Sequence, residues 1–171
     1  LFLTAFMFTV LTGTLFPLVE EAINGAKVSV GEPFFNRMSL PIVVTLLFLM
    51  GVGPALPWKA ASKAELKSKL IPPAAGAALL LIVALVAGAR NPYALLAFTF
   101  AGYAAFANLR EYWIGMRARH TAHGEGWGTA LVRLVGGNRH RYGGYTAHLG
   151  IILVALGVAA SSTFRSEHEA T

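Results

Sequence analysis

Few residues of this sequence can do chemistry in an apolar environment, and His148 is the foremost of them. It lies in a run, residues 142–160, that contains no Asp, Glu, Lys or Arg. If the run is helical, His148 lies about 9 Å past its start, at roughly 1.5 Å per residue. A run of this length spans the hydrocarbon core of a bilayer, where an ionisable side chain is costly and usually faces the protein interior. His148 is therefore our first candidate functional residue.

Small residues leave room beside this histidine. Gly144, Ile151 and Ala155 share a helical face with His148 by the i, i+4, i+7, i+11 pattern. Small residues of this kind suit a large flat cofactor bound through the imidazole. They equally suit a helix–helix seam that a histidine hydrogen bond holds together. The residues alone leave both interpretations open, and a proton relay is weaker because no carboxylate falls in any apolar run.

Other candidate groups lie in polar segments. His120 and His123 have the spacing H-x-x-H, but no third ligand is near, which favours solvated or lipid-facing histidines over a metal site. Arg139 and Arg141 flank the apolar run and are expected to set its orientation, with pairing to cofactor carboxylates as the alternative. The sequence has no Cys, which excludes disulfides and thiolate metal sites within it.

Composition indicates what kind of protein positions these groups. Of the 171 residues, 56% are hydrophobic and only 13% charged, whereas a soluble domain carries about a quarter charged residues. The chain is therefore predicted to be a membrane protein. Its formal net charge of +6 lies in short loops and not on one face, which argues against nucleic-acid binding.

The apolar runs predict an all-α, polytopic transmembrane helix bundle with about five crossings, in one membrane domain over residues 1–171. Lys and Arg outnumber acidic residues in loops 58–70 and 111–141, which are predicted to be cytoplasmic, and not in loop 20–37 or tail 162–171, which are predicted to be periplasmic. Trp58 is expected at a membrane interface. Because the chain begins at Leu1 inside an apolar run, we expect it to be a fragment whose N-terminal part is missing. The predicted helices cover residues 1–19, 38–57, 72–89, 93–110 and 142–161.

Two loops are predicted to do more than connect helices. The outer loop carries Phe34 and Phe35, which are candidates for partner contact or, alternatively, pack on the protein's own helices. The second loop contains Trp127 and apolar residues at helical spacing. We expect a short amphipathic helix lying at the membrane interface there.

Two stretches resemble one family. TLFPL (residues 14–18), followed by VSVGEPFFNRMSLPIVVTLLFLMGVGPALPW (28–58), and NRHRYGGYTAHLGIILVALGVAASSTF (138–164) resemble the C-terminal half of the cytochrome c-type biogenesis protein CcmF family. The order and separation of the stretches match, so the resemblance covers essentially the whole chain.

The resemblance implies a function in cytochrome c maturation. It implies a heme lyase of the bacterial inner membrane that receives heme from a periplasmic heme chaperone and attaches it to the CxxCH cysteines of apocytochrome c. It also implies thiol-reducing and apocytochrome-binding partner subunits and a b-type heme as reductant, with His148 as one axial ligand to the iron and Gly144 packing at the heme site. The tryptophan-rich heme segment and the other axial histidine of the family are not in this sequence, so the chain alone is expected to be inactive. A cofactor-free transporter-like or scaffold subunit is the alternative.

Overall fold

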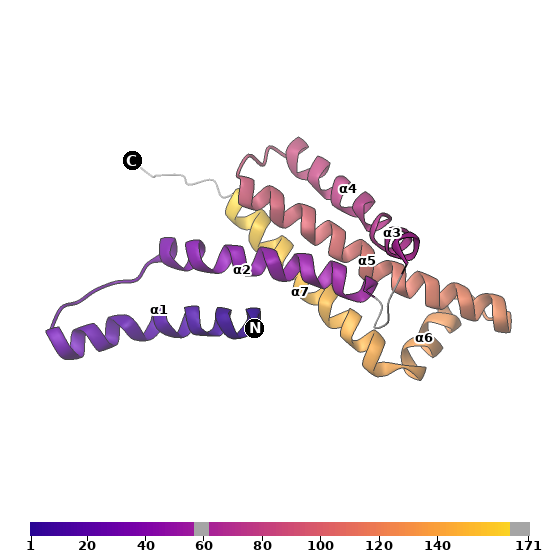
Figure 1. The fold of residues 1–171 in the computed structure, drawn as a ribbon, viewed down its shortest axis with the longest axis horizontal. Coiled ribbons are helices and arrows are strands. Elements are labelled where there is room, and N and C mark those ends of the chain that lie inside the picture. The colour runs from indigo at the N-terminus through magenta and orange to yellow at the C-terminus, as the bar shows by residue number, and fades with distance from the viewer. Residues whose placement is uncertain (57–61, 165–171) are drawn as a thin grey trace. The chain divides into compact units, whose positions relative to one another are not determined.

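The computed structural model describes residues 1–56 and 62–164, and all regular structure within these two ranges is helical (Figure 1). The predicted all-α class is confirmed. By length and composition, five helical segments could cross a membrane, which agrees with the predicted number of crossings: Phe2–Asn24, Glu32–Val52, Lys63–Val86, Pro92–His123 and Arg139–Thr163. Trp58 and most of the tail lie outside the described residues.

Contacts divide the chain into two compact units, Leu1–Leu46 and Leu47–Thr171, and each is described by itself. The expectation of one membrane domain stays a prediction. The first unit holds helix α1 (Phe2–Asn24) and most of helix α2 (Glu32–Val52). Helix α1 ends at Gly25, whose φ of 65° is left-handed and is cheap for glycine.

The loop between α1 and α2 is shorter than predicted. The predicted loop covered residues 20–37, but α1 continues through Glu20 to Asn24 and α2 begins at Glu32, which leaves residues 25–31. Charged residues ended the apolar run without breaking the helix, because only Gly25 supplies a backbone signal to stop. Asn24 Nδ2 donates to Glu20 Oε1 at 2.6 Å inside the added turn.

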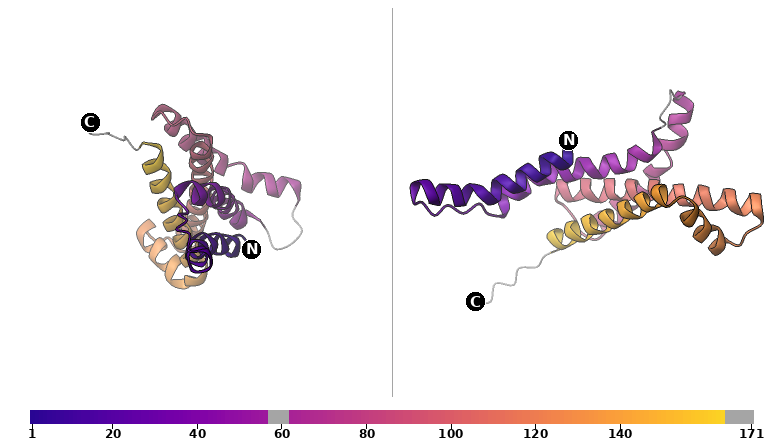
Figure 2. Two further views of the ribbon diagram at one scale, coloured as in Figure 1. Left: turned by 90° about the vertical axis from the view of Figure 1, so that its left-hand side faces the viewer. Right: turned by 90° about the horizontal axis from the view of Figure 1, so that it is seen from below.

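The second unit is built around one long helix, α5 (Pro92–His123), which contacts α4, α6 and α7 (Figures 1 and 2). The 3₁₀ turn η1 follows α2. The elements are η1 (Gly53–Ala55), α3 (Lys63–Leu70), α4 (Pro73–Val86), α6 (Trp127–Gly137) and α7 (Arg139–Thr163).

Helices α4 and α5 form a tight hairpin. Gly88, with φ of 95°, makes the turn, and Asn91 caps α5 by accepting from the amide of Tyr93 at 2.9 Å. Further along, Gly76 and Gly102 let the two backbones touch, since a Cβ on Gly76 would lie 2.5 Å from the carbonyl oxygen of Gly102. Small residues thus bring the helices together, as is common between membrane helices.

The predicted cytoplasmic loops are largely helical. Helix α5 was predicted over 93–110 but runs to His123, and α6 occupies the predicted amphipathic segment. The remaining predicted bounds differ by a few residues at each end, and α3 lies in the loop predicted over 58–70. Hydropathy marks only the part of a helix that lies in lipid, and no glycine in the left-handed region stops α5 before Gly124.

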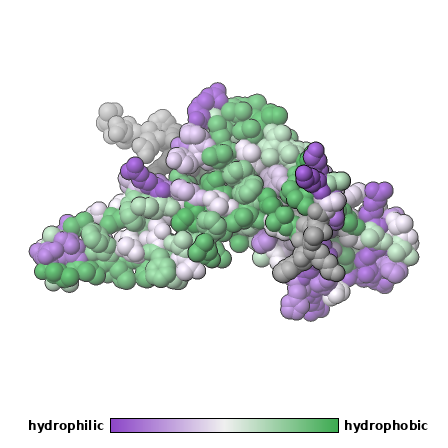
Figure 3. All heavy atoms as spheres, in the orientation of Figure 1, coloured by the Kyte–Doolittle hydropathy of each residue, from purple (hydrophilic) through white to green (hydrophobic). Residues whose placement is uncertain are grey.

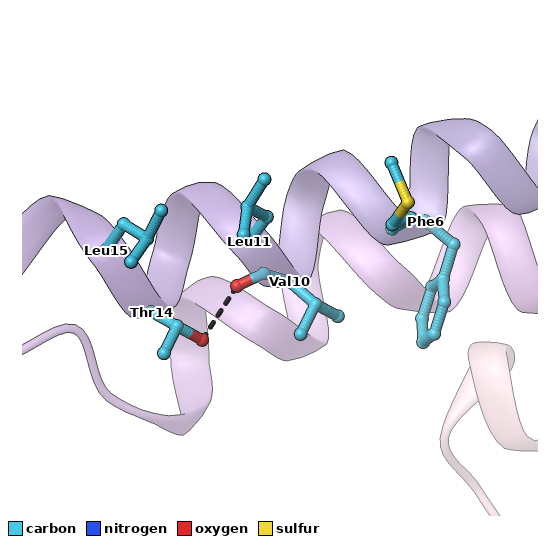
Figure 4. A pocket seen from close by; sticks show the side chains of 6 residues that line it. Phe6, Val10, Leu11, Thr14 and Leu15 are labelled. Atoms are coloured by element: carbon cyan, nitrogen blue, oxygen red, sulfur yellow. Dashed lines mark hydrogen bonds between the residues drawn. The ribbon is translucent and has the colours of Figure 1, made fainter.

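Apolar side chains cover much of the surface, including that of α1 and α4 (Figure 3). In the first unit an open hollow runs along one face of α1, and the residues that line it include no ionisable side chain (Figure 4). Thr14 Oγ1 donates to the carbonyl oxygen of Val10 at 2.8 Å, so the hydroxyl is satisfied by its own helix. This hollow offers lipid or another helix an apolar surface and offers no chemistry.

Candidate functional site around His148

Helix α7 carries His148 well inside its length. The helix begins after Asn138, whose Oδ1 accepts from the amide of Arg141 at 3.3 Å. His148 is nine residues beyond Arg139, which corresponds to roughly 14 Å along the axis. The structure therefore keeps the candidate side chain within a segment long and apolar enough to cross a membrane.

The imidazole lies at the border between the buried and the open side of α7. Its ring nitrogen Nδ1 is buried and has no hydrogen-bond partner among the described residues. Ile152, one turn on, is 1% exposed, whereas Ile151 on the other side is 55% exposed. The helical face that the sequence predicted for His148 thus forms the outer edge of the site. The buried side of α7 is the strip through His148, Ile152 and Ala159.

Space is open beside the histidine on the outer side. A Cβ built on Gly144 would have no atom within 4 Å, and the same holds for Gly150. Both glycines are exposed. A flat group lying along this side of α7 would meet no side chain of the described residues at these two positions.

The residues present fit one axial position of a heme and not a complete metal site. No group of three His, Cys, Asp or Glu side chains that could hold a metal occurs in residues 1–56 or 62–164. A neutral imidazole is a good ligand for heme iron. Buried polar atoms are usually paired, so a buried ring nitrogen without a hydrogen-bond partner is typical of a binding site that a ligand completes.

A polar and aromatic cluster fixes the start of α7 against α5. Tyr112 Oη lies 2.7 Å from the carbonyl oxygen of Tyr142 and 2.7 Å from Thr146 Oγ1. Arg141 pairs with Glu111 of α5, with 2.7 Å between Nη2 and Oε2, and its Nε donates to Tyr145 Oη at 3.2 Å. These contacts lie within two turns of His148 and hold its helix in register with α5.

The cluster bears on the predicted pairing of Arg141 with a cofactor carboxylate. Arg141 already has a carboxylate partner within the chain, in Glu111, which is 17% exposed. Arg139 is exposed. The role of both residues in membrane orientation stays a prediction.

His120 and His123 do not come together as a metal site. The ring of His120 stacks on Trp127 with 4.4 Å between centroids, and its Nδ1 lies 2.6 Å from the carbonyl oxygen of Glu125. Trp127 also stacks on Trp113, at 5.1 Å. His123 is exposed at the end of α5. His120 is therefore a packing residue of the α5–α6 turn.

Glu125 holds the same turn together by charge. It accepts from Arg119 Nη2 at 3.0 Å and from Arg133 Nη1 at 2.8 Å, and its side chain is 8% exposed. The hydrogen bond from Arg119, followed by that from Arg133, keeps the pKa of this carboxyl below its ordinary value, against the opposite effect of burial.

Phe34 and Phe35 lie in the first turns of α2, and both are partly buried. A Cβ on Gly13 would lie 2.8 Å from Phe34 Cε1 and 2.7 Å from Phe35 Cε1, so both rings pack over this glycine of α1. Their packing within the first unit is thus established, and their contact with a partner stays a prediction.

Two residues of this site were not singled out from the sequence. Asn108 is the one amide side chain within the apolar run of α5, which is a local signal that could have identified it. Glu111 pairs with a residue 30 positions away, and no local pattern indicates that pairing.

Comparisons with known proteins show that the chain is similar to the C-terminal part of curated cytochrome c-type biogenesis proteins. It is 35% identical over 161 residues to CcmF of Pseudomonas fluorescens, a match that covers 94% of this chain and 23% of that protein. It is 35% identical over 170 residues to CycK of Rhizobium meliloti, covering 98% and 24% of the two chains. CcmF of Escherichia coli is 29% identical over 174 residues, covering 98% and 24%.

The chain thus spans about a quarter of the length of the curated relatives it matches. No family model matches it. No solved structure matches it either.

Proposed function

We propose that this chain, which is homologous over nearly its whole length to the C-terminal part of the cytochrome c-type biogenesis proteins CcmF and CycK, takes part in cytochrome c maturation. The relatives carry that process in their names, and the chain is a multi-pass membrane protein like the family that its sequence resembles. The specific part that we assign to it is one wall of a heme site within a membrane heme lyase.

The observation that carries this assignment is His148, an imidazole with a buried, unpartnered Nδ1 inside a membrane-spanning helix. The neutral imidazole ring has a free nitrogen lone pair that can bind iron. When bound, a b-type heme supplies one-electron transfer, which keeps the incoming heme reduced for attachment to cysteine thiols.

The chain's own residues hold the ligand in place. The pair of Arg141 with Glu111 and the hydrogen bonds of Tyr112 tie α7 to α5, so the imidazole cannot slide along the membrane normal. Gly144 and Gly150 keep the outer side of α7 open for a flat group. Ile152, one turn beyond His148, is 1% exposed and makes the buried side of α7 apolar.

The partners follow from the same proposal. They are a heme chaperone, apocytochrome c, and the thiol-reducing and apocytochrome-binding subunits of the system, at the bacterial inner membrane. Loop 25–31 and the start of α2 are assigned to the periplasmic side, where Phe34 and Phe35 are the proposed contact. Loss of co-purification with these partners after Phe34→Ala and Phe35→Ala, with the fold intact, would support the contact, and unchanged co-purification would leave the rings as packing residues on Gly13.

The experiment that tests the heme assignment is a reduced-minus-oxidised optical spectrum of the complete protein, reconstituted in membranes together with the part that supplies the second axial ligand. His148→Ala is compared with His140→Ala, which removes an exposed histidine from the same helix. We expect a b-type signal that is lost or changes coordination only in His148→Ala. Identical spectra in both variants would exclude His148 as a ligand.

The same spectrum separates the alternatives. A protein from heme-replete cells that shows no Soret band would indicate a cofactor-free transporter-like or scaffold subunit. In that case His148→Asn should preserve maturation of c-type cytochromes, because an amide can keep a seam hydrogen bond.

A further inference from the structure

A second buried polar atom lacks a partner, and it belongs to Asn108 of α5. The residue is 0% exposed. Its Nδ2 donates to the carbonyl oxygen of Ala104 at 2.7 Å and approaches that of Met50 at 3.5 Å, but Oδ1 accepts nothing among the described residues. Together with His148 Nδ1, this oxygen makes up the buried unpartnered side-chain polar atoms of residues 1–56 and 62–164.

The orientation of the amide is fixed by a proline. In a helix the carbonyl oxygen of Met50 would accept from the amide of residue 54, but Pro54 has no N–H. The amide nitrogen of Asn108 therefore faces two carbonyl oxygens, of Ala104 and Met50, and a flipped amide would set oxygen against oxygen. Oδ1 is left as an acceptor that points elsewhere.

The register of α5 against α7 brings Asn108 to the level of His148. Tyr112 lies opposite the turn from Tyr142 to Thr146, and Phe98 packs in one cluster with Ala159. The two helices are thus antiparallel, and a step of four residues back along α5 matches four residues forward along α7. Asn108 lies one helical turn before Tyr112 on α5. His148 lies one helical turn beyond the middle of segment 142–146 on α7.

Both side chains also belong to the inner sides of their helices. Asn108 is four residues from Tyr112, so it lies about 40° around α5 from a residue that touches α7. His148 shares the buried strip of α7 with Ile152 and Ala159. The acceptor without a donor and the ring nitrogen without a partner therefore lie at one level of the α5–α7 pair, each on the buried side of its helix.

We infer that Asn108 is a positioning residue for His148: its Oδ1 accepts the hydrogen bond of Nδ1–H, directly after a small rotation of the ring or through one bridging water. This inference rests on the proposed function. An acceptor at Nδ1 fixes the tautomer that leaves Nε2 free for iron, and iron-ligating histidines usually have such a partner. The acceptor also makes the imidazole more electron-donating, which stabilises the oxidised iron.

The test is the reduction potential of the bound heme in two variants of the membrane-reconstituted protein. Asn108→Leu removes the acceptor but keeps a side chain branched at the same carbon, and we expect the potential to rise. Asn108→Asp keeps an acceptor, because its buried carboxyl group stays protonated to donate to the carbonyl oxygens of Ala104 and Met50, and we expect the potential to stay near that of the wild type. Tyr103→Phe is the matched control, because it removes another hydrogen bond from an α5 side chain to a carbonyl, Tyr103 Oη to Leu70 O at 3.0 Å, about one and a half turns away.

A purely structural role for Asn108 would lower thermal stability in both Asn108 variants and leave the potential unchanged, which would overturn the inference and not the proposed function. A wild-type protein without a heme signal would overturn both, and it would show this before any variant is made. Should Asn108→Leu fail to bind heme, ¹⁵N-histidine NMR of the wild-type protein decides: Nδ1–H is expected at His148, and an unprotonated Nδ1 would contradict the inference.

Discussion

Two side chains of α5 approach backbone carbonyl oxygens whose usual helical donor would be the amide of a position that proline occupies. Arg110 Nη2 donates to the carbonyl oxygen of Ser68 at 3.3 Å, and the residue whose amide would serve that carbonyl in a helix is Pro72. Asn108 does the same for Met50 opposite Pro54. In lipid an unpaired carbonyl is costly, so these residues stabilise the breaks in neighbouring helices while α5 itself stays continuous.

The carboxyl of Glu125 gives a prediction about pH. Because its pKa in the folded protein is below the ordinary 4.5, its ion pairs stabilise the α5–α6 turn above that pH and are lost as the pH falls through the lowered pKa. Fluorescence of the stacked Trp113 and Trp127 should therefore change below pH 4.5. In Glu125→Gln the change should be absent, and an identical acid transition in the variant would assign it to another group.

At the level of elements, the contact of α4 with α5 depends on having no side chain at two glycines. A methyl group on Gly102 would collide with the carbonyl of Gly76, and backbone atoms cannot move aside as a flexible side chain can. Even a single methyl group added at Gly76 or Gly102 is therefore expected to destabilise the hairpin.

We expect Gly102→Ala to destabilise the protein by about 1–3 kcal/mol, the usual cost of overpacking, in spite of the higher helix propensity of alanine. Thermal unfolding in detergent measures the effect. Gly128→Ala is the control, because its Cβ would meet no atom within 4 Å on α6, and it should be neutral or stabilising. Equal stability of the two variants would refute the close approach of α4 and α5.

Helix α6 confirms the predicted short helix, and its position at the membrane interface remains to be tested. Trp127 is exposed on one side while it stacks on Trp113. Leu131 and Val132 are exposed as well. In a protein whose only tryptophan is Trp127, lipids brominated near the headgroup should quench its fluorescence more than lipids brominated at the chain ends. Equal lack of quenching by both would place α6 in water.

At the level of the whole chain, charge predicts which side of the membrane each loop faces. The sequence has no Cys, so single cysteines can be labelled without background. In intact cells Ser29→Cys, between α1 and α2, should react with a membrane-impermeant maleimide, and Thr129→Cys in α6 should react only after lysis. Both positions are exposed. The reverse pattern would invert the proposed topology.

Local sequence patterns were enough to predict the helical class, the number of apolar spans and the isolated position of His148 in one of them. Length, hydropathy and the absence of charge are local properties, and the bilayer turns them directly into helices because it offers backbone groups no other partner. The resemblance to the CcmF family also rested on contiguous residues, and the relatives confirm it.

Only the tertiary structure decided which residues meet. The pairing of Glu111 with Arg141, the burial of Asn108 at the level of His148 and the return of α6 onto α5 join residues that lie far apart in the sequence. Helix α5 also continues beyond its apolar run, because a helix ends at a backbone signal such as Gly124 and not where hydropathy falls. Such contacts depend on the register of α6 and α7 against α5, which local periodicity does not encode.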